Sequence, residues 1–245
     1  MRTIQRTVLA GLSAVVLLVS LTGGAAADGG TATYRVTILN LTHGQPFTPP
    51  MVAIHRHSVD VFTVGTPASF GVKEIAENGN LGPLQSALNS TAGVGAVLAA
   101  TAPLVPIGSP GQTVHGFSNY WTTTITAPRD ARRISWVSML VCTNDGFTGV
   151  NSLKLPRHVG DTMAHFTAGY DAGTEINTEA FADIVPPCQG LIGVTGDPGT
   201  GTSNPTLAEG GVIHHHPGIA GVADLVPATH GWTDPVGLIV VERIG

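Results

Sequence analysis

Carboxylates and glycines gather in one stretch of a chain that is otherwise poor in charge. Charged residues make up only 11% of the sequence, yet two acidic segments flanked by glycine stand close together, residues 144–149 (NDGFTG) and 170–175 (YDAGTE). Ca²⁺ is a hard cation that prefers six to eight oxygen ligands from carboxylates, carbonyls and water. The glycine of the second segment lets the backbone turn sharply, so Asp171 and Glu175 can face one centre. Asp145 would supply a third carboxylate from a neighbouring loop.

The residues alone leave a second interpretation open. Asp-Gly is a common turn pair, and two solvated turns would carry the same letters. The sequence contains no EF-hand pattern, so the ligands of a calcium site would have to come from loops that are distant in the chain.

A second group of possible ligands is the triplet His214, His215 and His216 in a chain with ten histidines. Imidazole suits Zn²⁺ and Cu²⁺. Consecutive residues of a strand point to opposite faces, so at most two members of the triplet could share a centre from one side. The alternative, which we favour, is a polar loop or edge segment before Pro217 and Gly218.

The motifs of common enzyme classes are absent from the sequence. It has no G-x-S-x-G, no H-E-x-x-H and no P-loop lysine. We therefore expect a protein that is not an enzyme. The alternative from another class is a secreted Zn- or Cu-binding protein or a metal-dependent hydrolase that uses the histidines.

The N-terminus indicates export. Arg2 and Arg6 precede an apolar run over residues 8–21, and three alanines at 25–27 form a small-residue cleavage site. This order is typical of a secretory signal peptide, residues 1–27, and the run is short for a membrane span. We expect a mature chain, residues 28–245, that is secreted to the extracellular space or the periplasm and is not inserted in a membrane.

Two cysteines and the charge balance bear on the mature chain. In an exported protein, Cys142 and Cys188 most simply form one disulfide, although two buried free thiols remain the alternative. The formal net charge is −5, and no basic run follows the signal peptide. This argues against nucleic acid or an anionic membrane as a partner.

The elements that must position these residues are mostly strands. Aromatic and β-branched residues alternate over residues 34–41, 133–141 and 235–244, and 51–55 and 162–169 are shorter candidates. Short helices are expected between residues 62 and 100, with the alanine-rich segment 92–102 either helical or a flexible loop. Short strands with 32 glycines and 17 prolines indicate one all-β domain, an antiparallel β-sandwich with short helices in a long connection.

Both acidic segments resemble the signature segments of the spondin domain, which occurs in F-spondin-like matrix proteins and alone in secreted bacterial proteins. Residues 144–150 (NDGFTGV) are similar to the family pattern Pro-Ser-Pro-Asp-Trp-Phe-Val-Gly-Val, and residues 171–175 (DAGTE) to Asp-Ala-Gly-Thr-Asp. Gly146 stands where Trp is usual, and Glu175 where Asp is usual. Residues 34–42 and 47–50 also look like the start of the bacterial form.

The resemblance implies a β-sandwich related to C2 domains, one bound Ca²⁺ and a binding or adhesion role. Carried over by position, the ligands are Asp145, Asp171 and Glu175. The partner implied is a protein or glycan surface. The missing Trp puts in doubt any surface contact made by that side chain.

Overall fold

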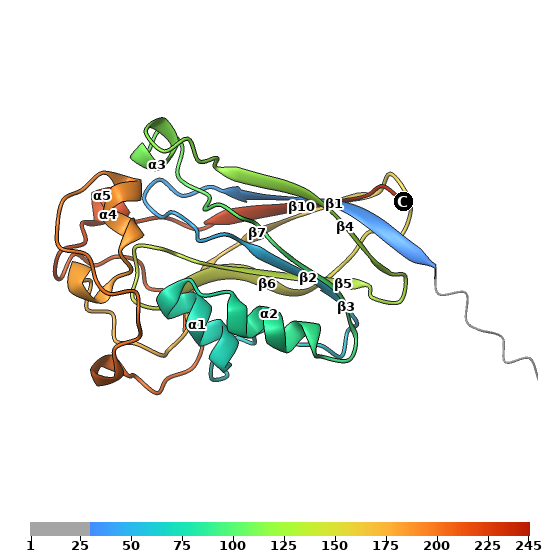
Figure 1. The fold of residues 1–245 in the computed structure, drawn as a ribbon, viewed down its shortest axis with the longest axis horizontal. Coiled ribbons are helices and arrows are strands. Elements are labelled where there is room, and N and C mark those ends of the chain that lie inside the picture. Colours follow the sequence, from blue (N-terminus) through green and yellow to red (C-terminus); the bar gives the residue numbers. More distant parts are fainter. Residues whose placement is uncertain (1–29) are drawn as a thin grey trace, which may run out of the picture.

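Two antiparallel sheets lie face to face in the computed structural model, which describes residues 30–245 (Figure 1). The proposed signal peptide lies outside the described residues. Loops and short helices of the second half of the chain gather at one end of the sandwich, and the C-terminus lies at the other end (Figure 1). None of the helices in residues 30–245 is long and apolar enough to cross a membrane.

Ten strands form the two sheets. They are β1 (Thr31–Asn40), β2 (Met51–His55), β3 (Val94–Ala99), β4 (Tyr120–Pro128), β5 (Arg133–Met139), β6 (Gly146–Lys154), β7 (Thr162–Thr167), β8 (Gly169–Asp171), β9 (His214–His215) and β10 (Gly237–Arg243). One sheet has the order β4-β1-β10-β7, and the other has the order β3-β2-β5-β6-β8-β9. The prediction of an antiparallel β-sandwich is confirmed.

The helices are short and lie in the connections. They are α1 (Phe70–Asn78), α2 (Gly82–Asn89), α3 (Pro110–Thr113), α4 (Pro187–Ile192), α5 (Pro227–His230) and the 3₁₀ turns η1 (Phe181–Asp183) and η2 (Pro205–Leu207). The expected helices between residues 62 and 100 are present as α1 and α2. Ser69 begins α1 by accepting the N–H of Val72, and Gly79 ends it with a φ of 65°.

Alternation along the central strands builds the core between the sheets. In β1, Ala32, Tyr34, Val36 and Ile38 are buried, while the residues between them are more exposed. Trp136 of β5 packs in the same cluster from the facing sheet. Burying one large apolar side chain stabilises a fold by about 1.5–3 kcal/mol, so this alternation fixes which face of each strand turns inward.

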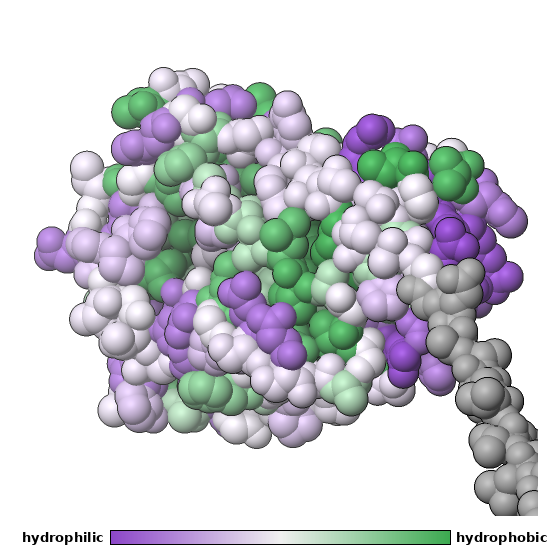
Figure 2. Space-filling view, turned by 45° about the vertical axis from the view of Figure 1, so that its right-hand side comes forward, coloured by the Kyte–Doolittle hydropathy of each residue, from purple (hydrophilic) through white to green (hydrophobic). Residues whose placement is uncertain are grey.

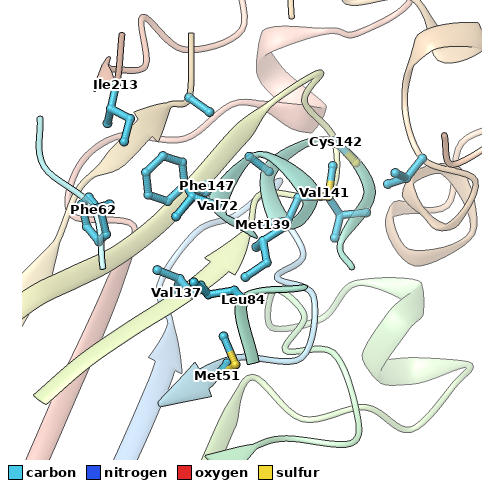
Figure 3. Packing of buried hydrophobic residues seen from close by; sticks show 14 of the residues in the cluster. Met51, Phe62, Val72, Leu84, Val137, Met139, Val141, Cys142, Phe147 and Ile213 are labelled. Carbon is cyan, nitrogen blue, oxygen red and sulfur yellow. The ribbon is translucent and has the colours of Figure 1, made fainter. Parts of the chain in front are cut away.

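A second apolar layer covers the outer face of the six-stranded sheet. Val72 of α1 and Leu84 of α2 pack against a cluster that includes Met51, Val137 and Met139 (Figure 3). Because both faces of β2 are covered, all five of its residues are buried. With the helices on the outer face, water is therefore excluded from both faces of the sheet at β2.

The alanine-rich segment is neither helix nor flexible loop, so that expectation is wrong. It contains β3, which pairs with β2 at the edge of the sheet. A Cβ on Gly95 would lie 2.9 Å from the ring of Pro128. Small residues are needed here because the strand passes close to the end of β4, and strand pairing outweighs the local helix preference of alanine.

The cysteines form the predicted disulfide, Cys142–Cys188, across 46 positions of sequence. Both residues are fully buried. The bond joins the turn after β5 to α4. Gln45 holds the same turn, because its side chain accepts the N–H of Cys142 and donates to the Cys142 carbonyl.

Candidate metal site

Asp145 lies in the tight turn between β5 and β6. Of the segment 144–149, predicted to be a loop, only the first two residues precede β6, because the strand begins at Gly146. Thr143 closes the turn: its hydroxyl donates to the Leu140 carbonyl (2.6 Å) and accepts the Gly146 N–H (2.8 Å). A Cβ on Gly146 would lie 2.4 Å from this hydroxyl oxygen. The turn therefore needs glycine where the spondin pattern has tryptophan.

Asp171 ends β8 beside this turn. The register pairs Asp171 with Gly146, and the Ala172 N–H donates to the Asp145 carbonyl. The chain then turns at Gly173, whose φ is 67° and whose N–H donates to Asp171 Oδ1 (2.7 Å). Strand pairing and this turn bring the two aspartates together from positions 26 residues apart in sequence.

The carboxylate of Asp145 is fully buried and only half satisfied. Its Oδ2 accepts the N–H groups of Thr174 (2.7 Å) and Glu175 (3.0 Å) and the Thr174 hydroxyl. Its Oδ1 has no hydrogen-bond partner in the structure. A buried carboxylate oxygen without a partner is costly, so this atom calls for a cation or a donor.

Glu209 supplies the third carboxylate. The oxygens of Asp145, Asp171 and Glu209 lie within 4.8 Å of one another. Backbone hydrogen bonds bring Glu209 close to the two aspartates. The Glu209 N–H donates to the Thr174 carbonyl, and the Gly211 N–H donates to the Gly173 carbonyl (2.7 Å). Nothing in the sequence around Glu209 marked it as a ligand.

Glu175, the third ligand implied by the resemblance, is not part of this group of oxygens. Its N–H faces Asp145, but its carboxylate turns away and accepts the N–H of Asn204 (2.7 Å). There it lines a hollow of about 270 Å³ with Glu77 and Asp183. The backbone of Glu175 bonds to Asp145 and forms a bridge with Ala208, the residue before Glu209.

Negative charge is uncompensated at the site. Burial, and then the neighbouring charge of Asp171, raise the pKa of Asp145 to about 6. Burial also raises the pKa of Glu175, to about 7. The ion pairs among residues 30–245 give Asp145 and Asp171 no Lys or Arg partner. Two carboxylates about 5 Å apart repel by on the order of 3 kcal/mol at an effective dielectric constant of about 20.

The donor set fits a hard divalent cation. The three carboxylates offer only oxygen ligands, and the buried Asp145 Oδ1 has no hydrogen-bond partner among the described residues. Oxygen donors of this kind suit Ca²⁺ or Mg²⁺ better than a thiolate- or imidazole-preferring metal.

The three histidines of the triplet lie in three different environments. His214 and His215 form β9, the edge strand paired with β8, as the favoured alternative predicted. His214 Nδ1 lies 3.8 Å from Asp171 Oδ1, and the His215 ring packs against Tyr170. The His216 ring packs edge-on against Trp232, and its Nδ1 accepts the Gly218 N–H. Only His214 borders the carboxylate group.

Comparison with known proteins gives a family for the chain. A search of the curated proteins finds no match. The sequence model of the Spondin_N family matches residues 40–182, which is more than half of the chain. The match contains both acidic segments, with Asp145 and Asp171, whereas Glu209 lies beyond it. The chain therefore belongs to the spondin N-terminal family.

Proposed function

We propose that the protein is an extracellular binding module whose end loops are held by one Ca²⁺ ion. The family and the buried Cys142–Cys188 disulfide suggest an extracellular location, because disulfides persist in oxidising compartments. Asp145, Asp171 and Glu209 are the ligands of the proposal, with further oxygens from water or backbone carbonyls.

The unpartnered Oδ1 of Asp145 carries the proposal. Every other carboxylate oxygen of the two buried aspartates accepts a hydrogen bond, from Thr174 and Glu175 on Asp145 or from Gly173 and Asn177 on Asp171. This one oxygen is buried beside a second and a third carboxylate. A dication at this position would satisfy the oxygen and offset the repulsion between the carboxylates.

The proposed ion has a structural role rather than a catalytic one. It would join three segments that lie far apart in sequence: the β5–β6 turn, the turn after β8, and the loop that carries Glu209. Fixed in this way, the loops present a rigid surface, which we propose meets a protein or glycan partner. No step of this function requires chemistry on the partner, so we propose a binding module and not an enzyme.

A transition-metal site is the second candidate. It is favoured by one observation, the 3.8 Å approach of His214 Nδ1 to Asp171 Oδ1. This ring also faces the Val212 carbonyl at 3.0 Å, and His215 and His216 turn elsewhere, so the histidine contribution would be a single nitrogen.

Thermal and denaturant unfolding test the proposal. At a Ca²⁺ concentration a hundred times the dissociation constant, ligand linkage adds about 2.7 kcal/mol to the free energy of unfolding relative to protein in EDTA. Asp145→Asn removes the charge and should abolish this difference. Asp197→Asn is the matched control, because Asp197 is exposed and makes no side-chain hydrogen bond in the described structure. Stabilisation of the wild-type protein by Zn²⁺ but not by Ca²⁺ would favour the second candidate.

A further inference from the structure

Basic residues gather at the end of the sandwich opposite the carboxylates. The sequence has 11 Lys and Arg residues, and two of them, Arg2 and Arg6, lie outside the described part. Six of the other nine line two adjoining hollows. They are Arg129, Arg132, Arg133, Lys154, Arg157 and Arg243. The chain has a formal net charge of −5, so the charge at this end is opposite in sign to that of the whole chain.

Sheet topology produces this concentration. Arg129 and Arg132 lie in the turn between β4 and β5. Lys154 ends β6, opposite Arg133, the first residue of β5. Arg243 ends β10, paired with Tyr34 of β1. Arg157 lies in the connection that follows β6. Strand ends from both sheets therefore meet at this edge, and Figure 2 shows a dense group of hydrophilic residues beside the place where the grey chain begins.

The guanidinium groups are oriented but not neutralised. Arg129 donates to the Thr31 carbonyl (3.1 Å), and Arg132 donates to the Arg129 carbonyl (3.2 Å). Arg243 donates to the backbone carbonyl of Arg157 and to the main-chain oxygen of Gly245, the last residue of the sequence.

No ion pair in residues 30–245 joins any of the six to an Asp or Glu side chain. Asp130 borders one hollow but pairs with Arg56. Asp161 stands near the other hollow and accepts the His158 N–H. The local field is therefore positive, and most donor nitrogens remain free for an anionic ligand.

The two hollows adjoin each other. Their volumes are about 250 and 230 Å³, and they share Arg132, Leu155 and Arg157 as walls. Each hollow also has cations of its own. A ligand with anionic groups spaced along a chain would engage both hollows at once, whereas a single small anion would use only one.

We propose that this basic end binds a polyanionic glycan, a chain of sugars that carries sulfate or phosphate groups. The only aromatic ring lining the hollows besides histidine is Tyr34, which is 3% exposed, so no platform is offered for the stacking of nucleic-acid bases. A concave, charged site also differs from the flat apolar and basic face that a membrane surface requires. An extracellular location places glycans among the available partners.

Binding of defined polyanions tests the proposal. The probes are a sulfated octasaccharide derived from heparin and phosphomannan, which separate sulfate from phosphate, with neutral dextran as the uncharged control. Calorimetry at several salt concentrations should show binding of at least one anionic glycan that weakens as salt rises, because salt screens exposed charges. The affinity should be the same in EDTA and in Ca²⁺, which makes this result independent of the metal proposal.

Two variants locate the site. Lys154 and Arg157 are exposed and make no side-chain hydrogen bond in the described structure, so Lys154→Gln and Arg157→Gln should leave the fold unchanged. Each should weaken glycan binding about fivefold, the effect expected for one basic residue at an anionic surface. Arg35→Gln is the matched control, because Arg35 is exposed, lies outside the hollows and pairs with Glu242. It should change the affinity less than twofold.

Several results would overturn the proposal. They are equal binding by the Lys154→Gln/Arg157→Gln double variant and the wild-type protein, absence of binding to both anionic glycans, and tighter binding to a single-stranded oligonucleotide or to phosphatidylglycerol vesicles than to the glycans.

Discussion

The two ends of the sandwich both concentrate charge, but they do so in opposite ways. At one end, Asp145 and Asp171 are fully buried, and one oxygen of each carboxylate accepts backbone N–H groups, while Asp145 Oδ1 has no partner among the described residues. At the other end, the basic side chains stand at the surface, and their partners are main-chain oxygens. Buried like charges need a small counter-ion that fits between them, whereas exposed charges can be met by a long flexible ligand.

This difference predicts how each end responds to mutation. Removing a buried charge or the frame that holds it should change the stability of the fold. Removing an exposed charge should change only the binding of a partner, because surface charges contribute little to stability. The predictions below test this contrast, beginning with the largest expected effect.

Loss of the disulfide should be the most damaging change. The Cys142→Ser/Cys188→Ser variant should lose about 4 kcal/mol of stability, since the bond closes a loop that spans 46 positions. The loop carries Asp145 and Asp171, so Ca²⁺ affinity should fall as well. Urea unfolding with and without Ca²⁺ measures both effects. A variant with unchanged Ca²⁺ affinity would show that the frame of the carboxylate end does not depend on this bond.

Acidification should lower the stability of the fold through His216, at the end of the sandwich that carries the carboxylates. Burial lowers the pKa of His216 to about 4, so its ring is neutral in the folded protein at pH values where the unfolded chain binds a proton. Its contribution to stability is complete above pH 6.5 and is lost as the pH falls toward 4, by up to roughly 3 kcal/mol. In saturating Ca²⁺, His216→Gln should make the free energy of unfolding fall less between pH 7 and pH 5. Equal falls in both proteins would contradict this account.

Glu209 and Glu175 should differ in their effect on the metal. Glu209→Gln removes a proposed ligand and should weaken Ca²⁺ binding about tenfold, which is 1.4 kcal/mol. Glu175→Gln changes a carboxylate that faces Asn204, so this variant should weaken Ca²⁺ binding less than Glu209→Gln does. Calorimetric titration of the two variants checks the order. The reverse order would favour the ligand set implied by the resemblance, Asp145, Asp171 and Glu175.

The smallest effect on stability is expected at the basic end. Arg157→Gln should change the free energy of unfolding by less than about 0.5 kcal/mol, because the side chain is exposed and makes no hydrogen bond in the described structure. Chemical denaturation measures this value. A loss above 1 kcal/mol would mean that the basic end is part of the folded frame, and the contrast between the two ends would fail.

The parts of the fold that the sequence predicted have strong local patterns. β1 and β10 alternate, and β5 alternates and then becomes apolar. The segment that forms β3 has only small and aliphatic residues, so its sequence does not distinguish a helix from an edge strand. Its structure is set by pairing with β2 and by the close passage of Gly95 beside Pro128.

The same distinction holds for the two charged ends. Asp145 and Asp171 stand in short contiguous motifs, so a carboxylate pair could be predicted from them. Glu209 reaches the pair through backbone bonds from its own N–H to Thr174 and from the Gly211 N–H to Gly173, and no local pattern encodes those bonds. The basic end was not predicted, because its six residues are spread from position 129 to position 243 and come together only through strand register.

Metal content tests the central claim most directly. Protein purified without a histidine-affinity step, stripped with EDTA and dialysed against equal concentrations of Ca²⁺ and Zn²⁺, can be analysed by mass spectrometry of the elements. The account predicts one Ca²⁺ per chain, and none in the Asp171→Ala variant. A stoichiometric transition metal with no Ca²⁺, or Ca²⁺ retained in full by that variant, would contradict it.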